Sequence, residues 1–207
     1  HKHDIEPNVI EAEGNVSEAI LKEALQLPCD LIVIGTHGTS GYRDGFIGTN
    51  AYNIIKYASC PVLTIPPKRK IVVFKKLLFP IRPITGALMQ FDTVANFLAA
   101  NATIDVVGLS YHTIEGETNL LDKIVEEIRM QLKKSGASTQ TFWGSIASIP
   151  EAVLQHAQQA NSDLIVITSL LDNMTKSNYI GPHAQRIIHQ SKVPVLIIKK
   201  MGVPAFA

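Results

Sequence analysis

The sequence predicts an α/β protein made of two copies of one unit, in each of which parallel strands alternate with helices. The first observation is a repeat: residues 30–34, Asp-Leu-Ile-Val-Ile, recur as residues 163–167, which is 133 positions further on. Residues 61–63, Pro-Val-Leu, recur at the same spacing as residues 194–196. The second observation is that these runs are β-branched and continuously apolar, as is typical of parallel strands buried on both faces. The ungapped register indicates a duplication.

Composition and charge narrow the function classes. The chain has 207 residues, 46% of them hydrophobic and 18% charged, which suits one or two globular domains. The formal net charge of +1 excludes the strongly basic surface that is typical of nucleic-acid binders. No apolar run approaches the ~20 residues that span a membrane. We therefore expect neither a nucleic acid nor a membrane as a partner.

The two cysteines, Cys29 and Cys60, give no sign of a redox or metal motif. Their spacing matches neither a CxxC pair nor a zinc site. Because the sequence also shows no secretory signal, we expect a cytoplasmic protein with free thiols. In that setting both side chains would pack as small buried hydrophobic groups.

Each unit is expected to contain the same short series of elements. An amphipathic helix follows Ser17 in the first unit and Ser148 in the second, because serine is a favourable N-cap. A buried strand, a short helix and a second buried strand come next, and a proline opens each second strand. The expected ranges are 31–34, 51–58 and 62–65 in the first unit, and 164–167, 184–190 and 195–198 in the second.

The second unit has an additional stretch that the first unit lacks. A full unit then has about five strands and four helices, joined by right-handed crossovers. Shifted by the repeat spacing, this stretch would precede residue 1, so the first unit is expected to lack about 60 residues. The expected strands are 75–81, 105–109 and 139–143, the expected helices are 86–100 and 119–134, and the domains are 1–69 and 70–207.

A glycine-rich loop follows the first strand of the first unit. Gly35 and Gly38 enclose two residues, and nine more residues lead to Gly48-Thr49, where a helix begins. Glycines let backbone N–H groups approach a ligand, and a helix N-terminus at the carboxyl end of a parallel strand attracts anions. We therefore predict a phosphate-binding loop. Its candidate residues are Gly35, Thr36, His37, Gly38, Gly48, Thr49 and Asn50.

Two roles are open for each of three side chains in this region. Thr49 is suited to donate its hydroxyl to a phosphate and equally to cap the helix. His37 is placed either to touch a phosphate or to pack within the loop. Arg43 either reaches a phosphate or stays solvated.

This loop and its flanking strands resemble the universal stress protein family. The similarity lies in residues 30–38, Asp-Leu-Ile-Val-Ile-Gly-Thr-His-Gly, in the Gly-Thr at the helix entrance, and in residues 60–66, Cys-Pro-Val-Leu-Thr-Ile-Pro. The resemblance implies two tandem Rossmann-type domains of the adenine nucleotide alpha hydrolase-like class, each with a parallel five-stranded sheet in the order 3-2-1-4-5. It also implies a stress-response protein that binds ATP, with Mg²⁺ accompanying the nucleotide.

The resemblance further implies how the nucleotide pocket is completed. Members that bind ATP use an aspartate at the end of the first strand, and backbone groups of the second strand hold the base. In the first unit these elements would precede residue 1, so the chain is expected to have only the phosphate half of that pocket.

The second unit departs from the family pattern. Gly35, Gly38 and Thr49 correspond to Thr168, Leu171 and Pro182, and Gly181 alone is retained. Arg82 stands where the family has its aspartate. Leucine would obstruct a phosphate and proline has no N–H, so the second unit is expected not to bind ATP in the family manner. Arg82 and His183 are left either to hold another anion or to serve a structural role.

Assembly follows from the same resemblance. The strands at 62–65 and 195–198 are expected at sheet edges, where unpaired backbone groups invite pairing. Family members pair through this strand, and a tandem chain resembles such a dimer made covalent. We expect a homodimer, or completion of the first sheet by residues of another chain or by upstream residues. Otherwise Val33, Ile34 and Val62 would expose apolar faces.

Three function classes remain open at this stage. The leading one is a nucleotide-binding sensor or interaction module, and the second is a scaffold that binds no nucleotide. The third is a weak ATPase or autophosphorylating protein, because hydroxyl groups crowd the loop at Thr36, Thr39, Ser40 and Thr49. No catalytic set or metal-ligand spacing is found in the sequence.

Overall fold

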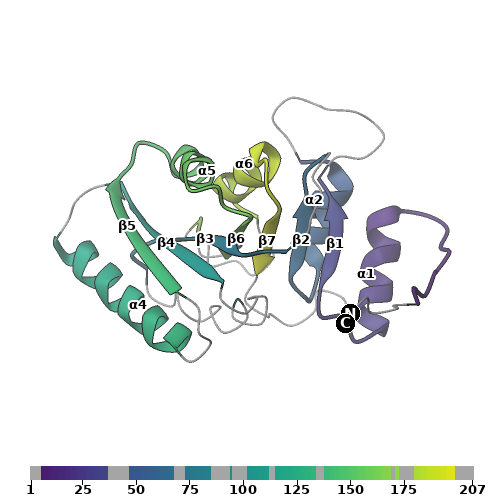
Figure 1. Cartoon of the computed structure of the whole chain (residues 1–207). Coiled ribbons are helices and arrows are strands. Elements are labelled where there is room, and N and C mark those ends of the chain that lie inside the picture. The colour runs from purple at the N-terminus through teal and green to yellow at the C-terminus, as the bar shows by residue number, and fades with distance from the viewer. Residues whose placement is uncertain are drawn as a thin grey trace.

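The computed structural model describes residues 6–36, 47–67, 73–84, 94, 102–111, 115–133, 138–168, 171–172 and 180–198. We call the described residues up to 67 the N-terminal segment and those from 73 onward the C-terminal segment. Together they form one seven-stranded sheet with the order β1-β2-β7-β6-β3-β4-β5 (Figure 1). The strands are β1 Ile32–Gly35, β2 Val62–Ile65, β3 Lys76–Ile81, β4 Thr103–Ser110, β5 Ser138–Ser145, β6 Leu164–Thr168 and β7 Val195–Ile198. The helices are α1 Val16–Gln26, α2 Thr49–Tyr57, α4 Glu115–Lys133, α5 Ile149–Gln159 and α6 Pro182–Gln190.

The α/β class predicted from the sequence is confirmed, and the sheet is mostly parallel. Strands β3 to β7 run parallel to one another, in the spatial order β5-β4-β3-β6-β7. Numbered along the chain, these five strands lie in the order 3-2-1-4-5. In the part of the chain that the structure describes, no helix has the length and apolar character needed to cross a membrane.

The two segments repeat the same local structure at the spacing seen in the sequence. The bounds of α1 and α5, of α2 and α6, and of β2 and β7 all differ by 133 residues. Strand register repeats as well: Ile32 lies opposite Val62 in the N-terminal segment, and Ile165 lies opposite Val195 in the C-terminal segment. The two segments have the same spacing of apolar residues, and they therefore form the same helices and strands with the same strand register.

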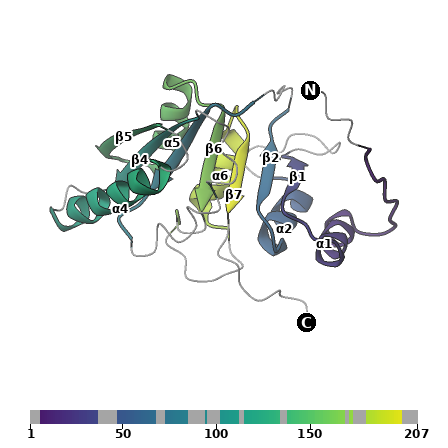
Figure 2. The same ribbon diagram turned by 60° about the horizontal axis from the view of Figure 1, so that its bottom comes forward.

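An antiparallel contact between β2 and β7 joins the segments into one sheet, and both views show these strands side by side (Figures 1 and 2). Leu63 lies opposite Leu196, its own counterpart at the repeat spacing. The hydroxyl of Thr64 donates a hydrogen bond of 3.1 Å to the carbonyl oxygen of Val195. Because equivalent residues face each other, the joint has the local two-fold relation of a symmetric dimer interface.

This joint places β2 and β7, which were expected at sheet edges, inside the combined sheet. The edges of the sheet are β1 and β5. Since β2 and β7 are antiparallel, the carboxyl ends of β1 and β2 point away from those of β3 to β7. Ligand sites at carboxyl ends of strands would therefore lie at opposite ends of the sheet.

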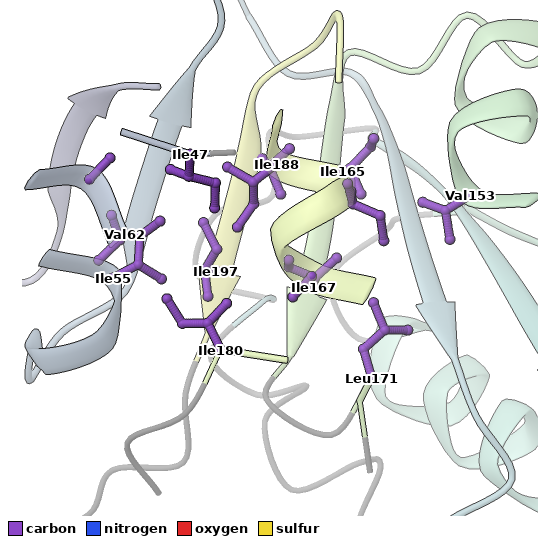
Figure 3. Packing of buried hydrophobic residues seen from close by; sticks show 14 of the residues in the cluster. Ile47, Ile55, Val62, Val153, Ile165, Ile167, Leu171, Ile180, Ile188 and Ile197 are labelled. Atoms are coloured by element: carbon purple, nitrogen blue, oxygen red, sulfur yellow. The ribbon is translucent and has the colours of Figure 1, made fainter. Parts of the chain in front are cut away.

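One buried cluster passes through the joint and includes residues of α1, α2, α5 and α6 (Figure 3). Ile55 and Val62 of the N-terminal segment and Ile188 and Ile197 of the C-terminal segment belong to it. The prediction that Val62 is exposed is wrong, because its exposure to solvent is 1%. The strand is covered on both faces of the sheet. Val33, on edge strand β1, is 57% exposed, as predicted.

A second cluster covers the opposite face of the sheet beneath α4. It contains Ile124 and Ile128 of α4 together with Phe79, Leu164 and Leu196 of the strands. The helix predicted at residues 86–100 lies outside the described residues, apart from Val94, which is helical and buried.

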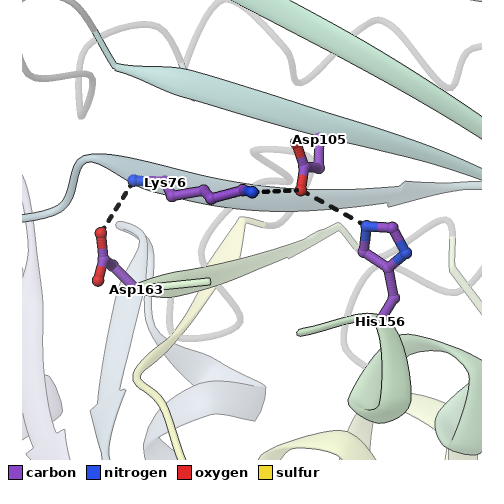
Figure 4. Close-up of polar contacts among 4 residues, drawn as sticks. All are labelled: Lys76, Asp105, His156 and Asp163. Carbon is purple, nitrogen blue, oxygen red and sulfur yellow. Dashed lines mark hydrogen bonds and ion pairs between the residues drawn. The ribbon is translucent and has the colours of Figure 1, made fainter. Parts of the chain in front are cut away.

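A buried polar group lies near the amino ends of β3 and β4 (Figure 4). Asp105 is fully buried, and its Oδ2 lies 3.6 Å from Nζ of Lys76 and 3.5 Å from Nε2 of His156. Asp163 accepts hydrogen bonds from the backbone N–H groups of Lys75 and Lys76 at 3.1 and 3.0 Å. Parallel sheets bind ligands at the carboxyl ends of strands, so this group has the position of a structural ion pair.

The cap predicted at Ser17 is wrong. Helix α1 starts at Val16, and Oδ1 of Asn15 accepts hydrogen bonds from the backbone N–H groups of Ser17 and Glu18 at 3.0 and 3.2 Å. Asparagine and serine are both favourable caps. Asn15 is the cap in the structure, and Ser17 is buried in the first turn of the helix. The cap position predicted at Ser148 is confirmed for α5.

Candidate functional site

The candidate phosphate site is the turn between β1 and α2. Gly35 is the last residue of β1, and the backbone N–H of the buried Thr36 donates to the carbonyl oxygen of Ile65 at 3.2 Å. Gly48 is the N-cap of α2 and Thr49 its first helical residue. The reading of Thr49 as the cap is therefore wrong, which leaves its hydroxyl at the helix entrance. His37, Gly38 and Arg43 lie outside the described residues.

Among the residues that the structure describes, none places an anionic side chain on the N-terminus of α2. Its N-cap glycine has no side chain to accept a hydrogen bond, and its first turn contains no acidic residue. Asn50, the second helical residue, is exposed. The first N–H groups of a helix have no partner within the helix, and the helix dipole adds positive potential there. Within the described ranges, these donors have no side chain to cap them, so the turn is suited to an anion.

Gly48 is not required by the backbone. Its φ of −56° and ψ of 142° are open to any residue. A Cβ added at Gly48 would lie 3.6 Å from the carbonyl oxygen of Thr36, an ordinary contact. Neither conformation nor packing explains the glycine. What it does provide is an open approach to the helix N-terminus.

The equivalent helix N-terminus in the C-terminal segment is occupied by the chain itself. Oδ1 of Asp172 accepts a hydrogen bond of 2.8 Å from the backbone N–H of His183, and Oδ2 accepts one of 3.1 Å from Ala184. At the repeat spacing, His183 and Ala184 correspond to Asn50 and Ala51 of α2. A carboxylate thus takes two of the donors that an anionic ligand would need.

The packing around Gly181 requires a glycine, whereas the packing around Gly48 does not. A Cβ at Gly181 would collide with the carboxylate group of Asp172. The glycine is therefore needed to admit Asp172, and its retention in the C-terminal segment does not indicate a ligand. Sequence reasoning missed Asp172 because an aspartate in a loop has no distinctive pattern. The available signal was that position 172 corresponds to Thr39, where no carboxylate is present.

Leu171 differs from its predicted role. We expected its side chain to obstruct a phosphate, but it is 2% exposed and belongs to the buried cluster (Figure 3). Its backbone N–H donates to the carbonyl oxygen of Thr168 at 3.1 Å, which forms a turn directly after β6. The leucine fixes this turn in the core, and the neighbouring Asp172 is what closes the site.

Arg82 and His183 flank Tyr111 at the carboxyl ends of β3 and β4. The guanidinium carbon of Arg82 lies 5.7 Å from the centre of the Tyr111 ring, and the Tyr111 hydroxyl lies 3.2 Å from Nε2 of His183. Arg82, Ser110 and Tyr111 line a cavity of about 420 Å³. These contacts give both residues a role in cation–π and hydrogen-bond packing, where the sequence left two readings open.

No metal centre is found among the described residues, which contain no group of three His, Cys, Asp or Glu side chains able to hold an ion.

The two glycines provide a matched pair of stability predictions. Gly181→Ala should lower the free energy of unfolding by about 1–3 kcal/mol, because the new methyl group displaces the Asp172 carboxylate from two N–H groups. Gly48→Ala should change it by less than about 1 kcal/mol in either direction, because its backbone and surroundings accept a methyl group. Urea unfolding of the two variants would measure this. Equal losses would contradict the assignment of Asp172 as the cap of α6.

Comparisons with known proteins identify the family. The family model described as the universal stress protein family matches residues 1–66 and 75–199. A universal stress protein of Thermus aquaticus is 38% identical over 53 residues, which is 26% of this chain and 39% of the relative. The protein YxiE of Bacillus subtilis, a universal stress protein, is 30% identical over 61 residues, which is 30% of this chain and 41% of the relative.

A solved structure supports the fold. The crystal structure of a universal stress protein from Archaeoglobus fulgidus superimposes with a TM-score of 0.63 and 17% sequence identity, covering 89% of this chain and 65% of that one. The chain spans about two fifths of the length of the Thermus aquaticus and Bacillus subtilis relatives, at 39% and 41%. The match of the family model to nearly the whole chain shows that the protein belongs to the universal stress protein family.

Proposed function

We propose that the protein binds the phosphate groups of a nucleotide, ATP in the first place, at the turn between β1 and α2. The observation that carries this proposal is the difference between two equivalent helix N-termini. That of α6 is capped by Asp172, whereas that of α2 has no side-chain cap among the described residues. An open helix N-terminus preceded by a glycine-rich turn attracts phosphate through backbone N–H groups and the helix dipole.

Each candidate residue has a role in this proposal. The backbone N–H groups of Thr49 and Asn50 would donate to phosphate oxygens, and the Thr49 hydroxyl would add a further donor. Gly35, Thr36, His37 and Gly38 would supply the turn that lets the chain approach the phosphates closely. The open backbone at Gly48 supports this arrangement. Mg²⁺ would arrive with the nucleotide, held by phosphate oxygens.

We further propose that the chain contains two tandem units, residues 1–69 and 70–207, of which the first alone takes nucleotide. The matching bounds of α1 and α5, and of α2 and α6, support the division. The β2–β7 joint supports the view that one chain reproduces the pairing of two separate subunits. Bound nucleotide would then act as a signal that alters how the protein meets a partner, and no catalytic group is assigned.

Calorimetric titration of the full chain with Mg²⁺ and ATP tests the proposal. Gly38→Leu copies the residue that stands at the equivalent position, Leu171, so it is compatible with this fold. We expect at least a tenfold weaker affinity, about 1.4 kcal/mol, because a leucine that packs into the core, as Leu171 does, would remove the close backbone approach that a glycine offers to the phosphates. Asp172→Asn is the control, and it should leave the affinity unchanged because Asp172 lies at the other end of the sheet. Equal affinity of the wild type and Gly38→Leu for the nucleotide would contradict the assignment of the phosphate-binding loop.

A further inference from the structure

The two cysteines, which are 31 positions apart in sequence, meet in the fold. Sγ of Cys29 lies 3.4 Å from Sγ of Cys60, and it also donates to the carbonyl oxygen of Leu31 at 3.6 Å. Cys29 precedes β1 and Cys60 precedes β2, and these strands are parallel neighbours with Ile32 opposite Val62. The register of two adjacent strands therefore brings both thiols to the amino end of the same strand pair.

The two thiols differ in access. Cys60 is buried at 8% exposure, whereas Cys29 is half-buried and lines a groove of about 640 Å³ between α1 and β1. Ile20 and Ala24 of α1 form the opposite wall of this groove. A small molecule in this groove can thus reach Cys29, whereas Cys60 is not among the residues that line the groove.

Burial and the neighbouring thiol of Cys29 raise the pKa of Cys60 to about 12, so Cys60 is the protonated partner near neutral pH. A thiolate is the species that attacks a disulfide. The accessible Cys29 is therefore the attacking group, and Cys60 is the one that acts second.

We propose that Cys29 and Cys60 form a dithiol site that a small disulfide such as oxidised glutathione converts into an intramolecular disulfide. The Cys29 thiolate attacks one glutathione sulfur, the glutathione S–S bond breaks, and the first glutathione leaves as a thiolate that takes up a proton. Cys60 then gives its proton to solvent and attacks Sγ of Cys29, which releases the second glutathione. The protein loses two electrons and two protons, and one glutathione disulfide becomes two thiols.

The site is a property of the N-terminal segment alone. The equivalent positions in the C-terminal segment hold Ser162 and Val193, which cannot form such a bond. It is also separate from the phosphate turn, because the cysteines lie before β1 and β2 whereas Gly35 ends β1. The dithiol site therefore does not depend on nucleotide binding.

The full reduced chain, incubated with oxidised glutathione in mildly alkaline buffer, tests the proposal by intact mass and peptide mapping. We expect a monomer lighter by two hydrogen atoms, a linked pair of peptides containing Cys29 and Cys60, and two thiols that no longer react with iodoacetamide. Because the bond would close a loop in the unfolded chain, the oxidised form should melt roughly 5–10 °C higher. A persistent glutathione adduct, a disulfide-linked dimer or unreacted thiols would each overturn it.

Single variants test the order of the steps, and serine is close enough to cysteine in size to keep the packing. Cys60→Ser should accumulate one glutathione on Cys29, because the second thiol is missing. Cys29→Ser should stay unmodified, because Cys60 is buried. Glutathione on Cys60 in Cys29→Ser, formed as fast as the Cys29 adduct, would contradict the assigned roles.

Discussion

Thr39→Asp is expected to weaken the binding of Mg²⁺ and ATP to the full chain by about 100-fold. Position 39 is the counterpart of Asp172, whose carboxylate accepts hydrogen bonds from two backbone N–H groups at the N-terminus of α6. An aspartate introduced at this position is expected to do the same at α2. It would compete for the N–H groups of Asn50 and Ala51 and would repel phosphate oxygens by its charge.

Thr39→Asn is the control for this prediction, because it has the same shape and no charge. It should lower the affinity by less than about threefold, since an uncharged amide oxygen competes only weakly for backbone donors. Calorimetric titration of the three proteins under the same ionic strength gives the comparison. If aspartate and asparagine weakened binding equally, bulk at position 39 and not an internal anion would explain the effect.

Leu63→Ala is expected to lower the free energy of unfolding by about 2–4 kcal/mol, and Leu196→Ala by a similar amount. These two leucines lie opposite each other at the centre of the β2–β7 joint, with exposures of 7% and 1%. Removal of either side chain leaves a cavity at the place where the two segments become one sheet. Urea unfolding measures both effects.

Val33→Ala is the matched control for the joint. Val33 is paired with Leu63 in the sheet but is 57% exposed on the edge strand, so its truncation should cost less than about 0.5 kcal/mol. The double variant Leu63→Ala with Leu196→Ala should lose less than the sum of the two single losses, because the side chains share one cavity. A full sum, or an equal loss from Val33→Ala, would show that the two segments fold without this contact.

Much of the fold could be predicted because the duplicated runs are strongly apolar and bounded by proline and glycine. The strands at 62–65 and 195–198 have the bounds that the sequence predicted. Continuous β-branched runs leave little choice but a buried parallel strand. Helix starts were less certain, since Asn15 and Ser17 are both good caps and only the packing of Ser17 distinguishes them.

The joint between the segments was harder to predict in detail. The family resemblance indicated that β2 and β7 are pairing strands and that a tandem chain resembles such a dimer made covalent, but it did not give their register. Their register depends on Leu63 facing Leu196, which is a long-range contact that leaves no local pattern. Val62 was placed at an exposed edge for the same reason.

The candidate site was predictable where backbone features matter and unpredictable where side chains meet. Gly48 and Thr49 were identified from the glycine spacing together with the flanking runs that resemble the family, and they do lie at a helix N-terminus. The role of Asp172 depends on a loop that brings its carboxylate to His183, 11 positions later in the chain. The contact of Cys29 with Cys60 likewise depends on strand register. It could not be predicted from the sequence, because neither cysteine belongs to a recognisable motif.

Backbone amide chemical shifts of the labelled full chain, followed during titration with Mg²⁺ and ATP, test the central claim most directly. The account predicts large, saturable shifts at Thr49, Asn50 and Ala51, which begin α2. It predicts little change at His183 and Ala184, whose N–H groups are held by Asp172. Shifts centred on His183 and Ala184, or none at Thr49, Asn50 and Ala51, would contradict it.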